Sequence, residues 1–127
     1  MHSEVLSYLD RTIDTIKSLL RQQLVACKSD ASQPCSVSGY AESIPRGLAR
    51  FRALHRARTA IRRQPVSRQL MQCQHEAERY AQGGLYWRAI SSGDRASALR
   101  REGYVAAGED LSAIFALAKP SPAAERS

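Results

Sequence analysis

The first stretch of the chain repeats apolar residues at the spacing of an α-helix. Seven of them recur at intervals of four, four, three, four, four and three: Val5, Leu9, Ile13, Ile16, Leu20, Leu24 and Cys27. This spacing places all seven on one side of a helix. The chain has only two Phe and one Trp, and the β-branched and aromatic clusters that strands favour are scarce. The sequence therefore predicts an all-α protein, a small bundle of four to five helices without β-sheet.

A second helical stretch, residues 46–68, carries the whole basic excess of the chain. It holds eight arginines, no lysine and no acidic residue. Residues 1–45 hold four basic and five acidic groups, and residues 69–127 hold seven of each. The formal net charge of +7 therefore depends on this one segment. Such a helix either pairs its arginines with carboxylates of its neighbours or offers them to an anionic partner.

On a helical projection at about 100° per residue, this arginine-rich helix has two different apolar sides. Large side chains occupy a broad arc and small ones a narrower stripe: Leu48, Phe51, Leu54, His55 and Ile61 on the arc, and Ala49, Ala53, Ala57 and Ala60 on the stripe. Neighbours are expected on both sides, and the alanines allow one neighbouring backbone to come close. The helix is therefore predicted to be central in the bundle.

Five arginines of this helix are candidate partner-binding residues. Arg52, Arg56 and Arg63 lie together between the arc and the stripe, while Arg46 and Arg50 flank the stripe. Arginine is common at protein interfaces because its stem is apolar and its head pairs with carboxylates through two hydrogen bonds. Carboxylates on neighbouring helices, Asp10 and Asp14 among them, are the competing partners for these side chains.

A further candidate contact is the run Tyr86-Trp87-Arg88. These three residue types supply much of the binding energy in protein interfaces. The alternative for Trp87 is that it fills the core of a bundle built mostly from small residues.

Cap and turn signals divide the chain into five predicted helices. Ser43 and Pro45 mark the start of the second helix, and Gln64-Pro65 marks its end. The expected bounds, in a single domain over residues 1–119 followed by a disordered tail, are about 3–27, 43–64, 67–82, 94–102 and 108–119, with the tail at 120–127.

Glycines and prolines also predict how the helices end and pack. Gly83-Gly84 is a stop signal for the third helix. Gly103 and Gly108 each cost about 1 kcal/mol inside a helix, so we expect a break between them, with one bent helix as the alternative. The short connection around Pro65 predicts an antiparallel hairpin of the second and third helices. The first three helices are expected to form the core, with the C-terminal helices packed across them.

No motif in the sequence points to catalysis, and we expect no cofactor. Cys73 and His75 point about 200° apart on a helix, and four ligands at a metal-binding spacing are missing. We therefore predict no metal site. Cys73 lies on an apolar face and is expected to behave as a small buried hydrophobe. His55, on the apolar arc, is expected in the core or at an interface.

Neither a membrane-spanning segment nor a signal peptide is recognisable in the sequence. We therefore expect a cytoplasmic protein that does not insert into membranes. In that compartment Cys27, Cys35 and Cys73 are expected to be free thiols.

The sequence predicts a small cytoplasmic regulatory or adaptor protein that binds another protein and masks or recruits it. A transcription regulator and a secretion component are examples of this class. The alternative is a protein that binds nucleic acid without sequence specificity through its arginine-rich helix. An open arginine surface would favour nucleic acid, whereas arginines covered by carboxylates would favour a protein partner. Apolar stripes on every helix also predict a homodimer.

Overall fold

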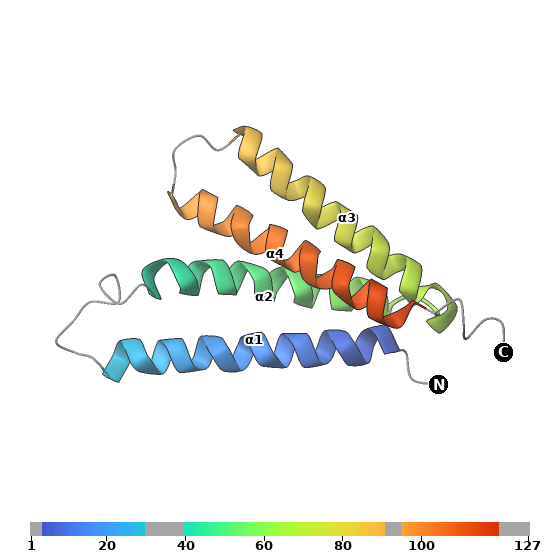
Figure 1. Cartoon of the computed structure of the whole chain (residues 1–127), viewed down its shortest axis with the longest axis horizontal. Helices are drawn as coiled ribbons and strands as arrows, with labels where there is room; N and C mark the ends of the chain where they lie inside the picture. Colours follow the sequence, from blue (N-terminus) through green and yellow to red (C-terminus); the bar gives the residue numbers. More distant parts are fainter. Residues whose placement is uncertain (1–3, 30–39, 91–94, 120–127) are drawn as a thin grey trace.

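Four α-helices make up the part of the chain that the structure describes. The computed structural model describes residues 4–29, 40–90 and 95–119, with side chains at all of these positions except 27–29, 40–41, 83–90 and 96. The predicted all-α bundle is confirmed, and the described residues contain no strand. The helices are α1 (Glu4–Ser29), α2 (Tyr40–Arg62), α3 (Val66–Ile90) and α4 (Arg95–Ala118) (Figure 1).

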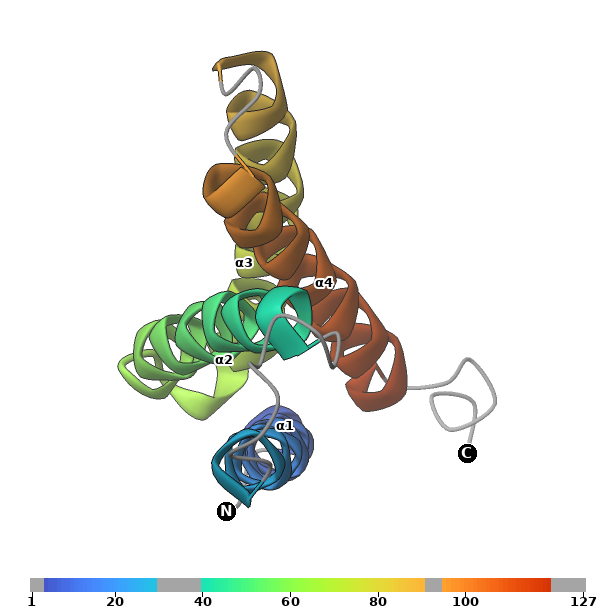
Figure 2. The same ribbon diagram turned by 90° about the vertical axis from the view of Figure 1, so that its left-hand side faces the viewer.

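The central helix of the bundle is α4. Both α2 and α3 make their most extensive contacts with α4, and α1 lies antiparallel beside α2 (Figure 1). In Figure 2, α1 is viewed close to end-on and α2 obliquely, and α3 and the first turns of α4 extend upward, away from them. The predicted antiparallel hairpin of the second and third helices is therefore wrong. The predicted core formed by the first three helices is also wrong, because α4 contributes to it. The reason is that α4 lies where α3 was expected.

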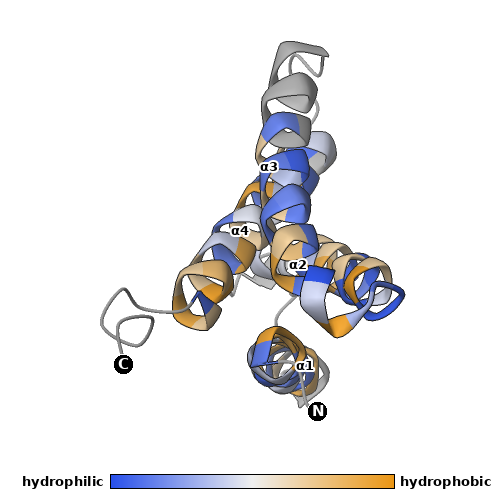
Figure 3. Ribbon diagram, turned by 90° about the vertical axis from the view of Figure 1, so that its right-hand side faces the viewer, coloured by the Kyte–Doolittle hydropathy of each residue, from blue (hydrophilic) through white to orange (hydrophobic). Residues whose placement is uncertain are grey.

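The core is aliphatic and rich in alanine. The first five residues of the predicted stripe on α1 are buried, whereas Leu24 is 42% exposed. Much of α3 is hydrophilic in Figure 3, in keeping with its position at the outside of the bundle. The buried cluster consists of Val5, Leu9, Ile13, Ile16 and Leu20 on α1, Ala53, Leu54, Ala57 and Ile61 on α2, Cys73 and Ala77 on α3, and Ala107, Leu111 and Ile114 on α4.

Two glycines of α4 allow a close approach to α2 and to α3. A Cβ on Gly103 would lie 2.5 Å from the Arg46 carbonyl oxygen and 2.6 Å from the Ala49 Cβ, both on α2. A Cβ on Gly108 would lie 3.2 Å from the Ala77 carbonyl oxygen of α3. The alanine stripe of α2 therefore does admit a neighbouring backbone, as predicted. The predicted break between Gly103 and Gly108 is wrong, because α4 is one helix whose glycines permit close packing.

Other helix bounds in the structure also differ from those predicted. The expected stop at Gly83-Gly84 is wrong, because α3 continues to Ile90; an interior glycine weakens a helix by about 1 kcal/mol without ending it. α2 begins at Tyr40, so Pro45 lies about one turn inside it rather than at its start. The end of α2 near Pro65 is confirmed: the Gln64 N–H donates to the Ile61 carbonyl at 3.0 Å. The predicted tail, 120–127, lies outside the described residues.

No helix, over the residues that the structure describes, combines the length and the hydropathy needed to cross a membrane.

Candidate functional site

Three arginines of α2 are held by carboxylates of the chain itself. The Arg46 Nε donates to the Glu102 Oε2 of α4 at 2.8 Å, and the Arg58 Nε donates to Asp10 of α1. Arg50 donates through both Nε and Nη2 to Asp110 of α4, at 2.6 and 2.7 Å. These three side chains therefore join α2 to α1 and α4.

The pair of Arg50 and Asp110 is the most enclosed of these. The Asp110 side chain is 16% exposed and that of Arg50 is 34% exposed. The hydrogen bonds to Asp110 raise the pKa of Arg50 above its ordinary value, although burial acts in the opposite direction. A bidentate pair with fixed geometry and little exposure is structural. Arg50 is therefore not available to an outside partner.

Arg46 belongs to a more exposed network at the start of α2 and α4. The side chains of Arg46 and Glu102 are 40% and 39% exposed. Glu42 lies 4.0 Å from Arg46 and also pairs with Arg95 at 2.7 Å. Solvent screens such pairs strongly, but each arginine in this network already has a carboxylate partner.

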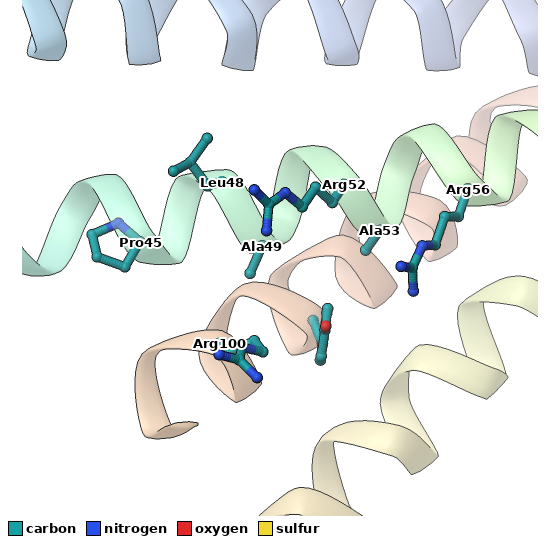
Figure 4. Close-up of a pocket in the computed structure, with 8 residues that line it drawn as sticks. Pro45, Leu48, Ala49, Arg52, Ala53, Arg56 and Arg100 are labelled. Atoms are coloured by element: carbon teal, nitrogen blue, oxygen red, sulfur yellow. The ribbon is translucent and has the colours of Figure 1, made fainter. Parts of the chain in front are cut away.

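A second group of arginines surrounds an open pocket between α2 and α4. Arg52 and Arg56 come from successive turns of α2, and Arg100 comes from α4 (Figure 4). All three are exposed, and the structure gives none of them an ion pair or hydrogen bond to another described side chain. The pocket has a volume of about 470 Å³, and its other lining residues are Pro45, Leu48, Ala49, Ala53 and Tyr104. We call this the arginine pocket.

The guanidinium groups lie apart around the arginine pocket rather than meeting at one point (Figure 4). Between them the floor is apolar, and Ala49 and Ala53 are almost fully buried. Where α3 comes close, the Tyr104 ring packs against Tyr80, with 6.1 Å between ring centroids. Burial and Glu76 raise the pKa of the Tyr80 hydroxyl, whereas the charges of Arg79 and Arg56 act against this shift. The arginine pocket is therefore formed by α2 and α4, and α3 contacts it through the Tyr80 and Tyr104 rings.

The structure places the predicted site residues in different environments: some line the arginine pocket and others form ion pairs. Arg52 and Arg56 are brought together in the arginine pocket, whereas Arg46 and Arg50 are paired. Arg63 follows the last residue of α2; it is exposed and does not line the pocket. Of the three arginines that the helical projection places together, the arginine pocket therefore includes Arg52 and Arg56. Tyr86, Trp87 and Arg88 lie in the last turns of α3, but their side chains are outside those described.

Sequence reasoning missed two residues of the pocket, Arg100 and Tyr104. They are four residues apart and lie on the face of α4 that carries Gly103. That spacing is visible in the sequence. Its meaning depends on the crossing of α4 over the alanine stripe of α2, which the sequence alone does not place.

Cys73 is buried, as predicted for a small hydrophobe. Its side chain is 0% exposed, and its Sγ donates to the Leu111 carbonyl at 3.4 Å. Burial, with a smaller contribution from Glu76, raises the pKa of the thiol to about 11. His55 is exposed, so the expected core position is wrong, and its ring centroid lies 5.3 Å from that of Phe51. Among the residues described, no three His, Cys, Asp or Glu side chains are grouped to hold a metal ion.

The arginine pocket is suited to holding an anion rather than to moving protons. Arginine stays charged at neutral pH and has only hydrogen-bond donors. Comparisons of the chain with protein-family models, with curated proteins and with solved structures found no match. The function is therefore inferred from the pocket itself.

Proposed function

We propose that this protein is a small helical adaptor or regulator that binds an acidic surface of another protein through the arginine pocket. One observation carries the proposal: Arg52, Arg56 and Arg100 surround an apolar floor without carboxylate partners among the described side chains. Binding there would mask or recruit the partner. A cytoplasmic location, expected from the sequence, is part of this proposal.

The distribution of charge supports a protein partner over nucleic acid. Arg46, Arg50 and Arg58 are neutralised by carboxylates of α1 and α4, so α2 does not present one unbroken cationic face. Nucleic acid binds proteins largely through a row of phosphate contacts. A concave site with an aliphatic floor matches a protein surface that combines carboxylates with apolar groups.

The second candidate is binding to nucleic acid without sequence specificity. It is favoured by the exposure of Arg62 and Arg63 in addition to Arg52 and Arg56, because these four charges extend beyond the pocket toward the end of α2. In that case all exposed arginines would contribute similarly.

Matched charge reversals separate the two candidates. We would capture partners from a cell extract with the full chain, with R52E/R56E and with R62E/R63E. Each double variant changes two exposed arginines of the same segment and alters the net charge equally. The proposal expects a protein that the full chain and R62E/R63E retain and that R52E/R56E loses. Equal capture by all three would contradict it.

Nucleic acid is tested by fluorescence anisotropy with labelled duplex DNA at rising salt. Binding that weakens equally in both double variants, and whose log K falls linearly with log salt concentration, would establish the second candidate instead.

A further inference from the structure

We infer that the arginine pocket binds an acidic peptide segment in which a large apolar side chain lies between carboxylates. This inference builds on the proposed function and names the chemistry that the partner must present. It follows from three features of the pocket: the separation of its charges, the nature of its floor and its size.

The separation of the charges argues for several anionic groups. Arg52 lies along α2 above the floor, Arg56 extends toward α3, and Arg100 approaches from α4 (Figure 4). Because the three guanidinium groups do not converge, a single small anion can contact only part of the set. Carboxylates spaced along a peptide can reach them separately, each through the two-pronged hydrogen bond that arginine forms with a carboxylate.

The floor between the charges argues for an apolar group at the centre of the ligand. Leu48 and Pro45 provide the accessible aliphatic surface of the floor, since Ala49 and Ala53 are almost fully buried. Tyr104 is the one aromatic residue lining the pocket, so there is no series of rings on which successive bases could stack.

The size of the pocket limits how much of the partner enters it. Its volume of about 470 Å³ falls within the range of about 300–1,000 Å³ that holds drug-sized ligands. That space accommodates a few side chains of a peptide rather than a whole helix. The recognised element is therefore short, with one apolar anchor and the carboxylates on either side of it.

A selection from a random peptide display library tests this inference. The library would be panned in parallel on the immobilised full chain, on R52E/R56E and on R62E/R63E. We expect peptides with Asp or Glu on both sides of a large apolar residue to be enriched on the full chain and on R62E/R63E. They should not be enriched on R52E/R56E. Enrichment of the same peptides on all three proteins would overturn the inference.

The best enriched peptide would then be measured by fluorescence anisotropy. Changing its carboxylates to amides, or its apolar anchor to serine, should each weaken binding about tenfold or more. In the protein, the R52A/R56A and R100A changes should each weaken binding of the peptide by a similar factor. The R62A/R63A change should alter the affinity by less than about threefold. An anchor variant that binds as well as the parent peptide would sink the inference, as would displacement of the peptide by inorganic phosphate.

The two proposals fail separately. If no acidic peptide is enriched but a captured protein is still lost in R52E/R56E, the inferred ligand chemistry is wrong and the proposed function stands. If R52E/R56E retains every captured protein, the proposed function fails whichever peptides are selected. Circular dichroism of each variant would establish that it is folded before these comparisons are made.

Discussion

Arg50 and Arg52 are two residues apart on α2, yet their surroundings differ completely. Arg50 faces the crossing with α4, where Asp110 accepts two hydrogen bonds. Arg52 lies beside the same crossing, where no described carboxylate reaches it. A rotation of about 200° along the helix therefore separates an arginine that joins two helices from one that is available for binding.

Replacing Arg50 should destabilise the fold, whereas replacing Arg52 should not. Arg50→Ala leaves Asp110, whose side chain is 16% exposed, without its partner, and we expect the free energy of unfolding to fall by about 1–3 kcal/mol. Arg52→Ala removes an exposed side chain and should change it by less than about 0.5 kcal/mol. Urea denaturation followed by circular dichroism measures both. Equal losses in the two variants would refute this assignment.

Cys73 should react slowly with thiol reagents. Its pKa of about 11 leaves roughly a hundredfold less thiolate at neutral pH than an unperturbed cysteine near 9 would have, and burial blocks access as well. In a C27S/C35S variant, where Cys73 is the only thiol, labelling at neutral pH should be slow until denaturant is added. Rapid labelling of the folded protein would show that the thiol is accessible.

The raised pKa of the Cys73 thiol also predicts that the protein loses stability at alkaline pH. The thiol pKa is higher in the folded protein than in the unfolded chain, so the folded state retains the proton more strongly. Its contribution to stability is therefore complete below about pH 9 and declines as the pH rises toward about 11. Comparing urea denaturation of the C27S/C35S variant with that of a C27S/C35S/C73A variant at rising pH isolates this contribution. Parallel stability curves for the two would contradict it.

At the scale of the helices, the three helical glycines for which neighbours are known should differ in their tolerance of a methyl group. Gly103→Ala places Cβ against the backbone of α2, at 2.5 Å from the Arg46 carbonyl oxygen. At Gly108 the nearest atoms are 3.2 Å away, and at Gly47 the contact at 2.7 Å is with the flexible end of Leu20. Alanine also improves helix propensity by about 1 kcal/mol.

We therefore expect Gly103→Ala to destabilise the protein by about 1–3 kcal/mol, Gly108→Ala to do so less, and Gly47→Ala to be neutral or stabilising. Urea denaturation of the three single variants tests the order. If Gly103→Ala were the most stable of the three, α2 and α4 would not cross at this residue.

These glycines also show which features of the fold can be predicted from the sequence and which cannot. Apolar periodicity predicted a bundle of four to five helices and no strand, because that signal is local. Gly103 and Gly108 were interpreted as helix breakers, because a glycine that breaks a helix and one that admits a neighbour look the same without the neighbour. For the same reason Arg52 and Arg56 were predicted as site residues but Arg100 was not: its role depends on which helix α4 crosses.

For the whole molecule, the sequence predicts a homodimer, and exposed apolar side chains offer a surface for it. Met71 is 71% exposed, Leu117 63% and Val66 49%, at the end of the molecule where α3 begins and α4 ends (Figure 1). We expect light scattering after size exclusion to give twice the chain mass, and M71E/L117E to give a monomer. V25E, at a residue 61% exposed on α1, is the control and should remain dimeric. A monomeric wild-type protein would refute the prediction.

The position of α4 has a consequence for how the protein is made. This helix leaves the ribosome after the three others, yet both α2 and α3 pack mainly against it. α1 and α2 can pair as soon as they emerge, but α3 must wait without its main contact, and the alanine stripe of α2 stays uncovered. Assembly of this bundle can therefore be completed only after α4 has been synthesised. Any ribosome pause between α3 and α4 prolongs a state with exposed apolar surface, in which aggregation and degradation compete with folding.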